Sequence, residues 1–260
     1  MADLAWAGLT ALVHLAVTAL VLGPVLWWRA RRAGRPVLAP GGGRRLALIG
    51  LTYLGATLVL HLPRIGALGE LAWNWQNKIL LLGLLLVLIR ALPGLSWRAV
   101  GVVRPRPGWL VPVVAVAVGT AAVLVVTGRL SGSPGEPAPG LETVLYQAIV
   151  PGLDEELLFR GVLLALAAEA LPGRVISARG AMRGTAVGWE VPLTCLLFGL
   201  AHGVVIGTGW ELQVEAGAIL TTGLIGGLLA WFRMRWASLL PAVLTHNGIN
   251  SAAVLAAYLT

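Results

Sequence analysis

The sequence predicts an all-α protein, a polytopic bundle of about eight transmembrane helices whose N- and C-termini are both extracytoplasmic. Composition indicates a membrane protein, because 58% of the 260 residues are hydrophobic and only 12% are charged. A soluble domain of this size usually carries about twice that charged fraction. Long apolar runs point the same way, since a spanning helix needs roughly 20 mostly apolar residues. The orientation rests on how the basic residues are distributed between the loops.

Eight apolar stretches are the candidate spans. Five contain no charged residue: 4–28, 46–63, 107–128, 191–210 and 236–260. Three are interrupted or short: 73–93, 142–170 and 216–232. The turn-rich segment 131–140 separates an N-terminal group of about four helices, residues 1–130, from a C-terminal group of about four, residues 141–260. Because no clear domain boundary lies between the groups, we expect one integrated membrane domain.

The net charge of +8 is explained by the loops. Of the 19 basic residues, 15 fall in four alternate loops. They are Arg29, Arg31, Arg32, Arg35, Arg44, Arg45, Arg90, Arg98, Arg104, Arg106, Arg174, Arg179, Arg183, Arg233 and Arg235. With the N-terminus outside, these loops are all cytoplasmic, which is the positive-inside pattern. We therefore expect an integral protein of a plasma membrane, that of a prokaryote, with the lipid bilayer and not nucleic acid as its surroundings.

Four ionisable residues interrupt the span 142–170. Asp154, Glu155, Glu156 and Arg160 lie within seven residues, and each costs about 2.5–3.5 kcal/mol at the centre of a membrane helix. Glu156 and Arg160 are an i, i+4 pair with the acid first, the better orientation for a helical ion pair. This pairing leaves Glu155 free as a candidate general base. The alternative from this segment alone is a buried ion pair that joins helices without chemistry.

Two later spans also carry polar residues at helical spacing. Phe198 and His202 are four residues apart, as are His246 and Asn250, so each pair lies on one helix face. A single membrane histidine is more often a helix–helix hydrogen bonder than a catalyst. Three spans that each carry groups suited to hydrolysis indicate one shared site.

In this order the residues resemble the three motifs of the CPBP family, which comprises CAAX proteases, bacteriocin-processing enzymes and related ABI proteins. The motifs are Glu155-Glu156-x-x-x-Arg160, Phe198-x-x-x-His202 and His246-x-x-x-Asn250. The resemblance covers roughly residues 140–256, while the first half is similar only in its number of spans and in a basic segment at 98–106. It implies an intramembrane peptidase whose site is buried in the membrane and reached from the cytoplasm.

The resemblance also implies roles. Glu155 with His202 would activate the attacking water, and His246 with Asn250 would stabilise the oxyanion. The neighbouring Glu156 and Arg160 would shape the site and contact substrate. Phe198 would help to form the site as part of the second motif.

A metal is left open by the sequence. The chain has no His-Glu-x-x-His signature. Even so, Glu155, His202 and His246 could bind Zn²⁺ with one position open for water. A metal-free water activated by glutamate is equally compatible.

We therefore expect an intramembrane (metallo)endopeptidase that acts on a peptide or protein, with or without a lipid on it. Two other functions compete with this one. The first is a catalytically silent relative that binds a peptide or partner protein, as immunity and regulatory proteins do. The second is a proton-coupled transporter with a relay of Glu, His and Arg, against which the lack of an internal repeat counts.

Overall fold

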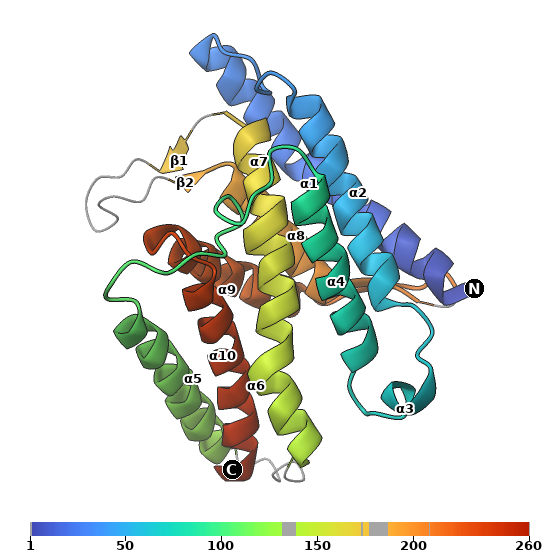
Figure 1. The fold of residues 1–260 in the computed structure, drawn as a ribbon, viewed down its shortest axis with the longest axis vertical. Coiled ribbons are helices and arrows are strands. Elements are labelled where there is room, and N and C mark those ends of the chain that lie inside the picture. Colours follow the sequence, from blue (N-terminus) through green and yellow to red (C-terminus); the bar gives the residue numbers. More distant parts are fainter. Residues whose placement is uncertain (1, 132–138, 173, 177–186, 208, 260) are drawn as a thin grey trace.

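A computed structural model describes residues 2–131, 139–172, 174–176, 187–207 and 209–259 of the chain. Within them the structure is a bundle of helices with two short two-stranded sheets (Figure 1). Arg179, Arg183 and most of the turn-rich segment 131–140 lie outside the described residues. The helices are α1 Ala2–Ala33, α2 Gly42–Leu60, α3 Gly66–Gly69, α4 Trp75–Ala91, α5 Leu110–Ser131, α6 Leu141–Glu156, the π-helix η1 Leu157–Leu163, α7 Leu164–Ala170, α8 Glu190–Gly203, α9 Ala216–Arg235 and α10 Leu240–Leu259.

A helix lies at each of the eight stretches expected to span, with α6, η1 and α7 forming one continuous rod. Four of the described helices are long and apolar enough to cross a membrane by length and composition. These candidates are Asp3–Ala33, Gly42–Leu60, Leu110–Leu130 and Ala216–Arg235. The membrane-type helical bundle is thus confirmed, whereas eight crossings and the outer location of both termini stay predictions.

The stretch 191–210 was expected to be one span, and this prediction is wrong in its second half. Helix α8 ends at Gly203, and the chain continues as strand β3 (Val204–Ile206), which pairs antiparallel with β4 (Leu212–Val214). A β-branched run bounded by glycines favours a strand and a turn over a helix. Fourteen helical residues measure about 21 Å, less than the ~30 Å of a bilayer core. A second short pair joins β1 (Arg174–Ile176) to β2 (Val187–Gly188).

Side chains of α1 hold the free edge of β3. The backbone N–H of Ile206 donates to Oγ1 of Thr10 at 3.1 Å, and the carbonyl of Val204 accepts from Nε2 of His14 at 2.9 Å. These bonds satisfy polar backbone groups that a membrane does not solvate. They also fix the hairpin directly after His202.

The rod α6–η1–α7 changes its winding near the acidic cluster. Pro151 cannot donate a backbone hydrogen bond, and α10 repairs the helix there through Asn247. Its Oδ1 accepts from Gly152 N–H at 2.8 Å, and its amide donates to the carbonyl of Ile149 at 3.1 Å. The π-helix η1 follows immediately, and all seven of its residues are buried. Such π segments occur frequently at functional sites.

The rest of the bundle packs around this rod. Helix α2 contacts α7 and η1, and α4 contacts α6 and η1. Helix α1 contacts α2 and α8, α8 packs on α9, and α10 packs on α5 and α6. Both halves of the sequence therefore contribute to one core, which includes Leu81, Leu85, Val162, Leu163, Ala167 and Leu197.

Candidate active site

The three consecutive carboxylates of the rod divide between two basic side chains, Lys78 for Asp154 and Glu155 and Arg160 for Glu156. Glu156 is fully buried and accepts from Nη1 of Arg160 and from Nδ1 of His246, both at 2.9 Å. The i, i+4 ion pair expected from spacing is therefore present. It also anchors a histidine of α10.

Glu155 is not the unpaired carboxylate that spacing suggested. Nζ of Lys78, from α4, lies 2.6 Å from its Oε1 and 3.0 Å from Oδ2 of the buried Asp154. The side chain of Glu155 is 17% exposed, and Lys78 is 11% exposed. One ammonium thus neutralises part of the charge of two carboxylates inside the bundle. Opposite charges in such a low-dielectric site offset part of each other's desolvation cost.

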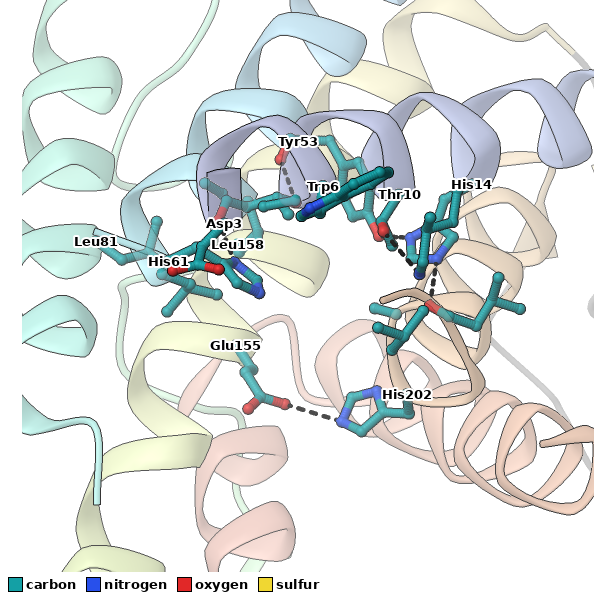
Figure 2. Close-up of a pocket in the computed structure, with 18 of the residues that line it drawn as sticks. Asp3, Trp6, Thr10, His14, Tyr53, His61, Leu81, Glu155, Leu158 and His202 are labelled. Atoms are coloured by element: carbon teal, nitrogen blue, oxygen red, sulfur yellow. Dashed lines mark hydrogen bonds and ion pairs between the residues drawn. The ribbon is translucent and has the colours of Figure 1, made fainter. Parts of the chain in front are cut away.

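The second oxygen of Glu155 faces both histidines of the motifs. Nε2 of His202 lies 3.6 Å from Oε2, and Nε2 of His246 lies 3.9 Å from the same atom. Within the described part of the chain this oxygen has no hydrogen-bond partner. Figure 2 shows Glu155 and His202 pointing at each other across the floor of a cavity.

Hydrogen bonds assign the tautomers of the two histidines. Nδ1 of His202 lies 2.8 Å from the carbonyl of Phe198, and Nδ1 of His246 lies 2.9 Å from Glu156. Both partners are acceptors, so each Nδ1 carries the proton. In the neutral state both Nε2 lone pairs then face Oε2 of Glu155. Three acceptors that converge without a proton between them form a place for a donor such as water.

Phe198 lies at the centre of this arrangement. Its ring centroid is 4.5 Å from that of His202 and 6.1 Å from that of His246, and the guanidinium carbon of Arg160 lies 4.1 Å from its centre. Gly226 of α9 leaves room for Arg160, since a Cβ there would lie 2.7 Å from Nη2. These contacts fix the relative positions of the three motifs.

A cavity of about 430 Å³ opens beside Glu155 and His202. Its lining includes the first turns of α1, the end of α2 and strand β3, with His14, Tyr53 and His61 among its walls (Figure 2). The hydroxyl of Tyr53 lies 2.7 Å from Nδ1 of His14, whose Nε2 binds the carbonyl of Val204. His14 thus ties α1 to α2 and to β3.

Comparison with known protein families identifies the family of the segment that carries these residues. Residues 137–252 match the family model described as type II CAAX prenyl endopeptidase, Rce1-like. The chain carries an Rce1-like domain. No curated protein and no solved structure matches the chain. The match confirms the resemblance to CAAX-protease-like proteins, and it covers all three motifs.

The Rce1-like domain does not build the site alone. It supplies both glutamates, both histidines and Phe198, while Lys78, His14 and Tyr53 come from helices that precede it. Lys78 is not among the 15 basic residues expected in cytoplasmic loops, and spacing predicted no role for it in the site. A charge imbalance in the sequence could have indicated it. The span 142–170 places three carboxylates beside one arginine, and Lys78, the single lysine among 19 basic residues, lies in another expected span.

Asn250 is not brought to the cluster of Glu155, His202 and His246 by any described contact. Its amide donates to Oε1 of Gln147 at 3.1 Å, across the interface of α10 and α6. Its role at an oxyanion therefore stays a prediction. Asn247, which spacing did not single out, instead bridges the helix at Pro151.

Binding of Zn²⁺ by Glu155, His202 and His246 stays a prediction. Across the described residues, no group of three or more His, Cys, Asp or Glu side chains has the geometry to hold a metal. The ammonium of Lys78 also lies against Glu155, where a divalent cation would meet a fixed positive charge. The chemistry below is derived from the protein's own groups.

Proposed function

We propose that the chain is an intramembrane endopeptidase that hydrolyses a peptide bond with water activated by Glu155 and His202. The observation that carries the proposal is the convergence of both Nε2 atoms on Oε2 of Glu155, at 3.6 and 3.9 Å, beside a cavity. Membership of a peptidase family in residues 137–252 supports it.

Water is the group that satisfies this geometry. A molecule between Oε2 of Glu155 and Nε2 of His202 would donate one hydrogen to each, which directs its oxygen lone pairs toward the cavity. Glu155 would accept the proton as the water attacks the peptide carbon, and would later deliver it to the leaving amine. The ammonium of Lys78 holds the other carboxylate oxygen and so fixes the direction of Oε2.

The tetrahedral intermediate also needs a hydrogen-bond donor for its oxyanion. His246 lies between Glu155 and Glu156, and its imidazolium form carries two donors. In that form Nδ1–H would donate to Glu156 and Nε2–H would point to the oxyanion. Glu156 and Arg160 then act as positioning residues, because they hold His246 in place.

The walls of the cavity fit a peptide more than a small polar molecule. Leu60, Leu81, Leu158 and Phe159 give them an apolar surface, and Val205 and Ile206 add the side of β3. A peptide segment in extended form could lie along this wall with its scissile bond above Glu155. The cleavage assay tests peptides with and without a lipid.

A second function is favoured by one observation. Lys78 pairs with both Asp154 and Glu155, and a general base held in a tight ion pair is a weaker proton acceptor. A catalytically silent protein that binds a peptide in the same cavity would show this pairing as a permanent feature.

Glu155→Gln separates the two functions. Purified protein in detergent is tested on a peptide library that includes farnesylated peptides. The wild type should cleave, and Glu155→Gln should lose at least about 100-fold of the rate. Glu169→Gln is the matched control, because it removes a carboxylate from the exposed pair with Arg45 and should leave cleavage unchanged. An inert wild type that still retains peptides would favour the binding function.

A further inference from the structure

The two ends of the bundle carry opposite charge. One end, called here the basic end, contains the loops after α1, α4 and α9. Hydrogen bonds from Arg45 to Glu169 and from Arg233 to the carbonyl of Ala99 join it to the rest of the bundle. Of the 15 loop arginines of the positive-inside pattern, the 13 that the structure describes belong to these loops and to the start of the segment after α7. The opposite end contains the start of α1, the end of α2 and the hairpin β3–β4, and its described carboxylates outnumber its arginines. Those carboxylates are Asp3, Glu70, Glu142, Glu211 and Glu215, against Arg64 and Arg129.

The cavity lies toward the opposite end. Its outer lining is formed by Asp3, Trp6 and His61, at the beginning of α1 and just beyond α2, while Glu155 and His202 form its floor (Figure 2). Asp3 and His61 are exposed. The exposed mouth of the cavity is therefore at this opposite end, called here the acidic end.

A packed core closes the path from the basic end. Beyond Leu158 the rod continues through Val162, Leu163 and Leu166, which are at most 3% exposed. Leu85 of α4, which has no exposed surface, belongs to the same core. From Leu158 to Ala170 the rod is about 18 Å long at 1.5 Å per residue. Interiors of this kind are close-packed, with few voids larger than a water molecule.

From these observations we propose that the active-site cavity opens to the extracytoplasmic side. Its substrate is then a peptide segment that has already been translocated or inserted, such as a secreted precursor or the outer part of a membrane protein. That the bound molecule is a substrate rests on the proposed peptidase function. That the cavity faces outward rests on the positive-inside rule, which sets the orientation of the bundle. This outward access differs from the cytoplasmic access that the family resemblance implied.

The class of reaction that supplies this substrate follows from the geometry. A cytoplasmic protein would meet the basic end, where the core is closed. A translocation or membrane-insertion step must therefore come before cleavage, and the products are released on the outer side or into the outer leaflet.

Cysteine accessibility in intact cells tests the proposal. Cys195 is the single cysteine and is replaced by alanine, after which three variants are compared. Asp3→Cys reports the mouth, Val205→Cys the cavity wall, where the native side chain is 47% exposed, and Arg44→Cys the basic end. A membrane-impermeant maleimide should label the first two in intact cells and Arg44→Cys only after permeabilisation.

Two results would overturn the proposal. Labelling of Arg44→Cys, but not of Asp3→Cys, in intact cells means that the orientation is reversed. Labelling of Val205→Cys only after permeabilisation, or only after denaturation, means that the cavity is not open to the outside. Repeating the experiment with Glu155→Gln should give the same labelling, because accessibility does not depend on cleavage. The labelling result therefore still shows where the cavity opens if the protein proves not to be a peptidase.

Discussion

Nζ of Lys78 lies 2.6 Å from Oε1 of Glu155, across 77 positions of sequence. The same ammonium lies 3.0 Å from Asp154, so one lysine from the first half of the chain sets the charge balance of the acidic cluster. This pair links the part of the chain before residue 137 to the Rce1-like domain.

Lys78→Met should destabilise the protein and reduce cleavage. It leaves two carboxylates in the bundle without their cation, and loss of one partner of a buried ion pair costs about 3–5 kcal/mol. Thermal unfolding in detergent and cleavage rate are the measurements. Adding Glu155→Gln to Lys78→Met should recover part of the stability but none of the activity. Strictly additive effects of the two substitutions would contradict the ion pair.

Glu156→Gln should differ from Glu155→Gln in stability. Glu156 is fully buried and binds both Arg160 and His246, so its neutral amide leaves Arg160 without a counter-charge. We expect a loss on the order of 3 kcal/mol together with lost cleavage. Glu155→Gln should lose cleavage and change stability much less. Equal melting temperatures for the two variants would show that the assignment of the two neighbours is wrong.

Tyr53→Phe should reduce cleavage by several-fold. It removes the hydroxyl that holds His14, and His14 holds the carbonyl of Val204 two residues after His202. Loss of one such hydrogen bond costs about 1 kcal/mol. Tyr258→Phe is the matched control, since that hydroxyl binds the carbonyl of Pro139 far from the cavity. We expect the effect of Tyr53→Phe mainly in kcat; a change confined to KM would argue for a role in substrate binding instead.

Gly152→Ala should destabilise the α6–α10 contact. A Cβ at this position would lie 2.5 Å from Oδ1 of Asn247 and 2.6 Å from the carbonyl of Val243. Overpacking of this kind costs about 1–3 kcal/mol. Gly83→Ala, where nothing lies within 4 Å of the added atom, should be neutral or slightly stabilising. Comparable melting temperatures for Gly152→Ala and wild type would contradict the close approach of α10.

A chelator should leave cleavage within about twofold of the untreated rate, because the proposed water activation uses Glu155 and His202 alone. The measurement is cleavage after dialysis against a strong chelator, followed by added Zn²⁺. Activity that disappears and returns with Zn²⁺ would replace the metal-free activation with one in which Glu155, His202 and His246 rearrange around the ion.

Sequence spacing determined what lies within one helix. Long apolar runs require helices, because a helix satisfies its own backbone polar groups in a bilayer. Periodicity then fixed the Glu156–Arg160 pair and the shared face of Phe198 and His202, since residues four apart are neighbours on a helix. The order of the three motifs was enough to indicate the family of residues 137–252.

The tertiary structure decided which distant groups meet. Lys78 and His14 approach the site only because α4 and α1 pack beside the rod, and no local period encodes such a contact. The end of α8 at Gly203 likewise depends on Thr10 and His14, which accept and donate the hydrogen bonds that the edge of β3 would otherwise lack. The tertiary structure also decides the direction in which the cavity opens. At one end of the bundle the helix ends surround an open space, and at the other they surround a packed core.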